Sequence, residues 1–307
     1  MRIVFMGTPD FAVPGLDLLI KSGFEIPAVV TAPDKPRGRG QQLSPTPIKE
    51  LALRHGLPIL QPESLKDPAF IQAIASLSPD LIVVVAFRIL PREVFSIPRL
   101  GAFNLHASLL PKYRGAAPIN WAIINGDKET GVTTFFLQDK VDTGNLLLQA
   151  RLPILPEDNA GTIHDKLAEV GAEIVLHTVR LIEQGKAVAR PQDDALASPA
   201  PKIFKEDCRI AWDHPALAIH NRIRGLSPYP TAFTTHGDKL LKLYRSTLTD
   251  TTSTRQPGTV LLDGQKLFVA TADHLLSIEE LQLEGRKRMS VEEFLRGYPI
   301  RTGQQLG

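Results

Sequence analysis

Cysteine is nearly absent from this chain of 307 residues, which contains only Cys208. A single cysteine cannot form an internal disulfide bond, so the chain fits a reducing compartment, and we expect it in the cytoplasm. The acidic neighbours Glu206 and Asp207 disfavour a thiolate at Cys208. The sequence therefore argues against a catalytic thiol and predicts an inert structural cysteine.

Long apolar runs are absent as well. No uninterrupted apolar stretch approaches the roughly 20 residues that a membrane-spanning helix needs. The first residues do not form a signal-peptide pattern, because only a short apolar run separates Arg2 from Gly7. We therefore expect no association with a membrane. No pattern for a protein partner is evident either, and we expect a monomer.

A strong excess of one charge is also missing. The net charge of +2 is too small to predict nucleic-acid binding by itself. With 43% hydrophobic and 22% charged residues, the composition is ordinary for a globular protein of two domains. The distribution of charge is more informative, because residues 33–49 contain a single acid, Asp34, among the basic residues Lys35, Arg37, Arg39 and Lys49.

Short apolar runs alternate with helical patterns in the first part of the chain. The runs occupy residues 2–6, 26–31, 80–87 and 102–107. The third is apolar on both faces, as in a buried central strand. This alternation predicts an α/β fold with a doubly wound, mostly parallel sheet, whose ligands bind at the carboxyl ends of the strands. A hairpin of residues 132–137 and 146–152 and a helix over 162–184 follow.

A second domain is predicted after an aperiodic stretch rich in Pro, Asp, Ala and Ser, residues 187–200. We place the first domain at 1–189, a linker at 190–204 and the second domain at 205–307. Its signals are a short helix near 215–224, a capping-box pattern from Ser290 to Glu293, and several short alternating runs. These runs predict a small β-barrel from strands at 231–235, 240–244, 259–262, 267–272 and 275–284.

The fourth apolar run contains two polar residues, Asn104 and His106. Because side chains alternate along a strand, both would point to one face, and Phe103 and Leu105 to the other. An amide can donate a hydrogen bond to an oxygen that becomes negative, and an imidazole can transfer a proton near neutral pH. A lone Asn or His at a strand end more often satisfies backbone groups, so a functional interpretation depends on the surrounding pattern.

The surrounding pattern is extensive. A loop rich in Gly and Pro follows at 108–118, and Asp142-Thr143-Gly144 lies further along the chain, where by itself it would be an ordinary turn. A carboxylate can orient an imidazole or favour its charged form. No second His or Cys lies nearby to complete a ligand set, so we expect no metal.

Taken together, residues 101–111 and 142–144 resemble the signature of formyltransferases that use 10-formyltetrahydrofolate. Residues 1–12, 32–49, 200–203 and 223–233 resemble the methionyl-tRNA formyltransferase family within that group, so the resemblance covers almost the entire chain. It implies transfer of a formyl group from 10-formyltetrahydrofolate to the α-amino group of methionyl initiator tRNA, which gives N-formylmethionyl-tRNA for translation initiation. It also implies that the barrel is OB-like and binds tRNA.

The resemblance assigns the chemistry to Asn104, His106 and Asp142. Asn104 would donate to the oxyanion of a tetrahedral intermediate. His106 would donate to the same oxygen or deliver a proton to the leaving nitrogen. Asp142 would keep His106 charged, orient it, or accept the amine proton through water, and the sequence leaves these roles open.

The resemblance also implies two binding surfaces. The folate site would consist of Val85, Phe87, Ile89, Leu90, Pro91, Ser108, Leu109, Leu110, Pro111 and Val141. The tRNA contacts would be the basic residues Lys35, Arg37, Arg39, Arg222 and Arg224, with Arg39 in a glycine-flanked loop as the leading contact. Relatives usually carry Tyr-Gly where this chain has Phe87-Arg88, so the rim of the folate site differs here.

Two other classes of protein are compatible with parts of this pattern. A transferase or hydrolase that uses formyltetrahydrofolate with a small acceptor would share the three catalytic residues, but it would not need the basic loop or the barrel. A non-catalytic RNA-binding protein on the same fold would not need Asn104, His106 and Asp142. We therefore favour the tRNA-directed enzyme.

Overall fold

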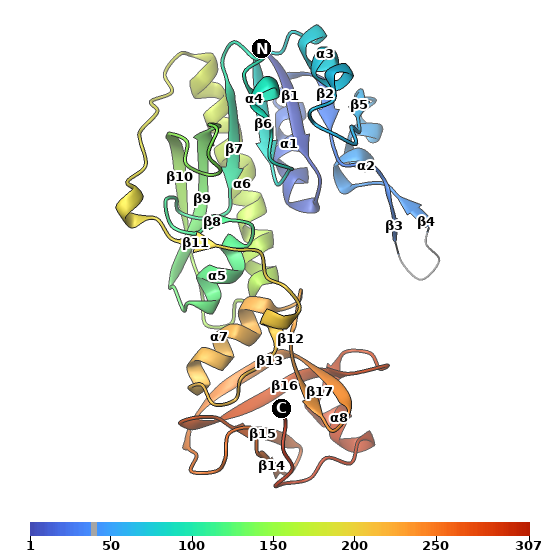
Figure 1. Ribbon diagram of the computed structural model, residues 1–307, viewed down its shortest axis with the longest axis vertical. Helices are drawn as coiled ribbons and strands as arrows, with labels where there is room; N and C mark the ends of the chain where they lie inside the picture. Colours follow the sequence, from blue (N-terminus) through green and yellow to red (C-terminus); the bar gives the residue numbers. More distant parts are fainter. Residues whose placement is uncertain (38–41) are drawn as a thin grey trace. The chain divides into compact units, whose positions relative to one another are not determined.

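The structure is a computed structural model that describes residues 1–37 and 42–307 (Figure 1). Its residues group into two compact units that interleave along the chain. One contains residues 1–115, 130–152 and 164–199, and the other contains 116–129, 153–163 and 200–307. The predicted division at 1–189, 190–204 and 205–307 is contiguous instead, and it stays a proposal.

A seven-stranded, mostly parallel sheet is the centre of the N-terminal part. β1 is parallel to β2 and β6, β6 is parallel to β7, and β2 is parallel to β5, whereas β9 is antiparallel to β7. The predicted parallel sheet is thus confirmed. In order across the sheet, the strands are β10 (Leu146–Pro153), β9 (Glu129–Phe136), β7 (Ala102–His106), β6 (Leu81–Val85), β1 (Arg2–Gly7), β2 (Glu25–Val30) and β5 (Ile59–Leu60).

Helices cover both faces of this sheet. α1 (Val13–Lys21) and α6 (Ala160–Glu183) lie on one face, where Gly15 approaches Phe5 and Gly171 approaches Leu105. α3 (Pro68–Ser76) and α4 (Arg92–Phe95) lie on the opposite face, and their apolar residues share a core with Val4 and other even-numbered residues of β1 and β6. The sheet is therefore doubly wound, as predicted. Packing of α6 on β7 fixes the strand that carries the polar pair.

The remaining elements of this part are short. α2 (Pro47–Arg54) begins at Thr46, whose hydroxyl accepts the Lys49 N–H and caps the helix. β3 (Lys35–Arg37) and β4 (Gln42–Ser44) pair antiparallel. The other short elements are η1 (Asp10–Ala12), β8 (Arg114–Gly115), η2 (Asp194–Leu196) and β11 (Pro199–Ala200). Two more, α5 (Pro118–Ile124) and η3 (Glu206–Cys208), belong to the second unit.

The C-terminal part is a domain of antiparallel strands around its own core, which confirms the predicted β domain. The neighbouring strands are β12 (Ala232–His236), β13 (Lys239–Thr252), β16 (His274–Leu283), β15 (Lys266–Ala270) and β14 (Val260–Asp263), and β17 (Met289–Ser290) also pairs with β16. Two helices, α7 (Ala216–Leu226) and α8 (Val291–Gly297), complete it. The predicted capping box is present at the start of α8, with Ser290 and Glu293 bonded reciprocally.

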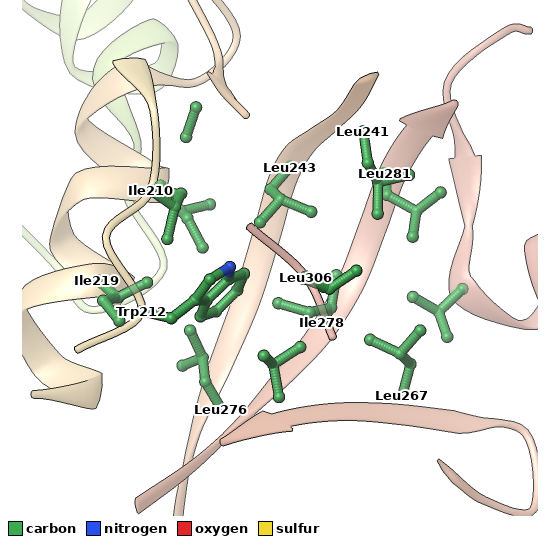
Figure 2. Close-up of a cluster of buried hydrophobic side chains, with 14 of the residues drawn as sticks. Ile210, Trp212, Ile219, Leu241, Leu243, Leu267, Leu276, Ile278, Leu281 and Leu306 are labelled. Atoms are coloured by element: carbon green, nitrogen blue, oxygen red, sulfur yellow. The ribbon is translucent and has the colours of Figure 1, made fainter. Parts of the chain in front are cut away.

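Large aliphatic side chains and one tryptophan fill the core of this domain. Figure 2 shows Trp212 among Ile219 of α7 and residues of β13 and β16. The Trp212 indole N–H donates to the Thr234 hydroxyl, so its polar atom is satisfied. Cys208 belongs to the same core, and burial raises the pKa of its thiol. A thiol that stays protonated fits the predicted structural role.

Candidate active site

The polar pair of β7 lies at the carboxyl end of this strand, on the α3 and α4 face of the sheet. Ala102 belongs to the core on that face, and alternation places Asn104 and His106 on the same side. Leu105 contacts α6 on the other side. The predicted alternation is confirmed, and its cause is that the apolar residues between the polar ones are needed for packing on α6.

Hydrogen bonding fixes the ring of His106. Its Nε2 lies 2.8 Å from the carbonyl oxygen of Tyr113, which can only accept, so Nε2 carries a proton. Its Nδ1 lies 3.8 Å from Oδ2 of Asp142. The two side chains are 7% and 10% exposed, which shields their interaction from water. Nδ1 is therefore the ring nitrogen that can exchange a proton with a ligand.

Asp142 is held by its own unusual loop. Its φ of 56° lies in the left-handed region, and its Oδ2 accepts the backbone N–H of Gly115 at 2.9 Å. A side chain at Gly144 would overlap the carbonyl oxygen of Phe136, so only glycine allows the loop to return so close to β9. The glycine of the Asp-Thr-Gly sequence is thus required by geometry. It brings a carboxylate to His106 from a distant segment.

Asn104 differs from its neighbours because its side-chain amide has no hydrogen-bond partner among the residues that the structure describes. The side chain is only partly buried. A half-buried amide with free donors can bind an oxygen of a ligand without breaking an existing bond. Asn104 and His106 thus share a face of β7, and the Asp142 carboxylate lies beside His106. Their catalytic roles stay a prediction.

Thr133 on β9 anchors the loop that follows β7. Its hydroxyl donates to the Ser108 carbonyl at 2.6 Å and accepts the Leu110 N–H at 3.1 Å. The Gln149 amide donates to the Thr133 hydroxyl and to the Leu110 carbonyl. These bonds fix the backbone of residues 108–111 beside the catalytic residues. Sequence reasoning missed Thr133 and Gln149, since isolated polar residues in strands carry no recognisable pattern.

The residues predicted to bind folate differ in their solvent exposure. Val85, Leu90, Ser108 and Leu110 are buried, and Leu90 belongs to the core under α3 and α4. Phe87, Pro91, Leu109 and Pro111 are partly exposed, whereas Ile89 and Val141 are largely exposed at 74% and 50%. The partly and largely exposed residues can contact a ligand directly. The buried ones support them, and the assignment of the whole set to folate stays a prediction.

Arg88, at the predicted rim of the folate site, makes hydrogen bonds to the segment after β5. Its guanidinium donates to the carbonyls of Pro62 and Glu63 at 2.8 and 2.9 Å, and it lies over the Phe87 ring at 5.3 Å. The preceding residue, Ala86, has a φ of 48°. The rim after β6 is therefore tied to the segment after β5 by side-chain bonds that a glycine could not make.

The basic residues predicted to contact tRNA differ in their exposure and in their hydrogen-bond partners. Lys35 is exposed on β3, only the backbone of Arg37 is described, and Arg39 lies outside the described residues. Lys49, at the end of the basic segment, binds Asp34 at 2.6 Å and lowers the pKa of this carboxyl group. Arg222 is partly buried and donates to the Asp207 carbonyl.

Arg224 differs from the other predicted contacts because its hydrogen bonds are internal, and its contact with tRNA stays a prediction. It is 9% exposed, and its guanidinium donates to Asn221 and to the carbonyls of Leu155 and Asp158. Burial lowers its pKa, and the internal bonds occupy Nε and Nη1 of the guanidinium. Arg222 and Arg224 are two residues apart on α7 and therefore lie on different sides of the helix, with Arg224 on the buried one.

We expect Arg224→Met to lower the free energy of unfolding by about 3 kcal/mol, because several buried acceptors would lose their donor. The KM for a tRNA substrate should change less than about twofold. Urea unfolding and steady-state kinetics measure the two effects, with Arg222→Met as the matched control on the same helix. A large rise in KM without loss of stability would contradict the internal role.

Within residues 1–37 and 42–307, no group of three His, Cys, Asp or Glu side chains is arranged to hold a metal ion. In the same ranges, no helix combines the length and the apolar character that crossing a bilayer requires.

Comparisons with known proteins show the family to which the chain belongs. Residues 1–179 match the family model described as formyl transferase, and residues 202–299 match that of the formyl transferase C-terminal domain. The methionyl-tRNA formyltransferase of Bacteroides fragilis is 49% identical over 310 residues, which cover 98% of this chain and 96% of the relative. That of Syntrophus aciditrophicus is 48% identical over 309 residues, covering 100% and 99%.

Solved structures are similar in fold at much lower identity. A crystal structure of WlaRD, a sugar 3N-formyl transferase, has a TM-score of 0.67 and 19% identity, covering 94% of this chain and 99% of that one. HypX from Aquifex aeolicus in complex with tetrahydrofolic acid has a TM-score of 0.67 and 18% identity, covering 100% and 50%. At these identities, the similarity extends to the fold alone.

Proposed function

The chain belongs to the formyl transferase family, and from this premise we propose how it acts: it transfers the formyl group of 10-formyltetrahydrofolate to the α-amino group of methionyl initiator tRNA. Formyl transfer to methionyl-tRNA rests on relatives that match the chain over its full length. To this we add the proposal that the acceptor is the initiator tRNA and not the elongator tRNA. The product is N-formylmethionyl-tRNA, which is used to initiate translation.

One observation supports the chemistry: the Asn104 amide, which has no partner within residues 1–37 and 42–307, lies on the same face of β7 as His106, and His106 Nδ1 is 3.8 Å from the Asp142 carboxylate. A donor for an oxyanion and a proton acceptor thus belong to one site. The partly exposed Phe87, Leu109 and Pro111 provide apolar surface for an aromatic pterin, so the residues present fit the folate donor.

The donor supplies a formyl carbon attached to N10, and the acceptor supplies a neutral amine. A bond forms between the amine nitrogen and the formyl carbon, and the bond from that carbon to N10 breaks, so nothing is oxidised or reduced. The amine loses a proton and N10 gains one. Asn104 stabilises the negative oxygen of the tetrahedral intermediate by hydrogen bonding.

His106 and Asp142 manage the proton transfers. Because the Tyr113 carbonyl accepts from Nε2, only Nδ1 of His106 can accept the amine proton or return one to the leaving nitrogen. The Asp142 carboxylate stabilises the imidazolium that results. Since Asp142 also accepts the Gly115 N–H, its orientation toward Nδ1 is fixed before a substrate binds.

Recognition of the tRNA is proposed to rest on basic residues. Lys35, Arg37 and Arg39 belong to or border the β3–β4 segment, and Arg222 belongs to α7; each is suited to phosphate contacts that do not depend on sequence. We further propose that the protein acts in the cytoplasm as a monomer. Because the proposed tRNA contacts are to phosphates, salt should weaken binding of tRNA much more than binding of the folate donor.

The acceptor is tested by supplying 10-formyltetrahydrofolate with methionyl initiator tRNA, methionyl elongator tRNA, uncharged initiator tRNA or glycinamide ribonucleotide. We expect formylation of the charged initiator tRNA, with kcat/KM at least about tenfold above that of the charged elongator tRNA. Release of tetrahydrofolate with the uncharged tRNA or the ribonucleotide would favour a hydrolase or a small-acceptor transferase instead.

A further inference from the structure

Residues 190–198, which we name the strap, lie against the loops that carry the catalytic residues. At its start, Arg190 exchanges two backbone hydrogen bonds with Leu146 of β10, at 2.7 and 2.9 Å. At its end, the Ser198 carbonyl accepts the Arg114 N–H at 2.9 Å. The sequence predicts this stretch, which precedes β11 in Figure 1, as part of a linker. Its contacts are instead those of an ordered part of the site.

Gln192 of the strap makes hydrogen bonds to the loop that carries Asp142. Its amide nitrogen donates to the carbonyls of Asp142 and Gly144 at 2.9 and 2.8 Å. Its Oε1 accepts from Nε and Nη2 of Arg114 at 3.1 and 2.7 Å. The orientation of the amide is unambiguous, because arginine only donates and carbonyls only accept. Both amide hydrogens of Gln192 therefore serve the loop that presents Asp142.

The loop that carries Asp142 has an unfavourable backbone conformation. Asp142 adopts a left-handed φ of 56°, which is unfavourable for a residue with a side chain. Bonds from one amide to the carbonyls on both sides of Thr143 hold that conformation in place. Without them, the carboxylate can leave the position 3.8 Å from His106 Nδ1.

The strap supports His106 as well. The Ser198 hydroxyl accepts the Tyr113 N–H at 3.0 Å, and the Tyr113 carbonyl accepts from His106 Nε2 at 2.8 Å. Tyr113 also has a left-handed φ, of 62°. One residue, Tyr113, therefore connects the strap to the imidazole, as Gln192 connects it to the carboxylate.

We propose that Gln192 is a positioning residue for Asp142, and that Ser198 has the same role for His106. The strap then acts on the active site through these two residues. This inference rests on the proposed function, because formyl transfer is the reaction whose rate reports the positioning. Neither residue needs to touch a substrate, so the expected effect is on kcat and not on KM.

The test compares Gln192→Ala and Gln192→Glu with the wild type. Misplacement of a catalytic group by about 1 Å can reduce the rate about 100-fold, so we expect kcat to fall by about 10- to 100-fold in both variants. The KM values for 10-formyltetrahydrofolate and tRNA should change less than about threefold. Gln192→Glu is the decisive variant, because its carboxylate still accepts from Arg114 but cannot donate to the carbonyls of Asp142 and Gly144.

Asp193→Ala is the matched control. Asp193 lies next to Gln192 and caps the 3₁₀ helix of the strap through the Ala195 N–H, but it makes no bond to the Asp142 loop. We expect its kcat to stay within about twofold of the wild type. Normal kcat in Gln192→Glu would overturn the proposal, because anchoring through Arg114 would then be sufficient.

Hydrogen exchange separates failure of this inference from failure of the proposed function. The Gly115 amide donates to the Asp142 carboxylate, so its exchange rate reports the loop without any substrate. We expect faster exchange at Gly115 in both Gln192 variants and an unchanged rate in Asp193→Ala. Unchanged exchange in the Gln192 variants overturns the positioning role, even if the acceptor proves to be another molecule.

Discussion

Replacement of Asn104 by alanine is expected to lower kcat by about 100- to 1000-fold, the usual loss when one positioned oxyanion donor is removed. The melting temperature should change little, because the Asn104 amide has no hydrogen-bond partner in the described part of the chain. The KM for the folate donor should change much less than kcat, since the bond strengthens only as the oxygen becomes negative. Steady-state kinetics and thermal unfolding measure both quantities.

Two further variants make this prediction specific. Asn104→Asp keeps the size of the side chain and removes the donor, so its kcat should fall at least as far. Asn159→Ala provides the opposite control: the Asn159 side chain accepts the Thr162 N–H at the start of α6, so its loss should cost about 1 kcal/mol of stability and leave kcat unchanged. Near-normal turnover of Asn104→Asp would exclude Asn104 as the oxyanion donor.

The second large effect is expected for Gly144→Ala. The added Cβ would overlap the Phe136 carbonyl oxygen, so the loop must move away from β9 and carry Asp142 with it. We expect kcat to fall at least about 100-fold, with a loss of stability of about 2 kcal/mol from backbone strain. Turnover measured with methionyl-tRNA, together with urea unfolding, tests both parts.

Gly297→Ala is the control for this substitution. Gly297 ends α8, and a Cβ there has no neighbour within 4 Å, so alanine should be tolerated or slightly stabilising. Gly144→Ala with normal kcat would mean that the Asp142 loop tolerates displacement. The carboxylate would then not need its position beside His106.

The sequence is sufficient to predict the architecture because each pattern has one physical interpretation. A run that is apolar on both faces predicts the buried β6, and alternation in β7 predicts that Asn104 and His106 share a face. A capping box marks the start of α8. The shared face of Asn104 and His106 is predictable for the same reason, whereas the catalytic roles of Asn104, His106 and Asp142 rest on the resemblance of their spacing to a known signature and stay a proposal.

Other parts of the site could not be predicted, because they depend on main-chain groups and tertiary contacts. His106 is oriented by the Tyr113 carbonyl, and any residue type supplies a carbonyl. Gln192 lies in a stretch without periodicity, so composition marks it as a linker, whereas its bonds hold the Asp142 loop. Arg224 carries a charge that suggests a surface position, yet its side chain is buried and donates to the carbonyls of residues 155 and 158.

The most direct test of formyl transfer is the stoichiometry of a single turnover. Enzyme in excess over methionyl initiator tRNA is mixed with 10-formyltetrahydrofolate, and the tetrahydrofolate released and the formylmethionyl-tRNA formed are measured from the same samples. The account predicts equal amounts of both products at every time, and neither product at a significant rate in Asn104→Ala. Tetrahydrofolate that accumulates without formylmethionyl-tRNA would mean hydrolysis and would contradict the account.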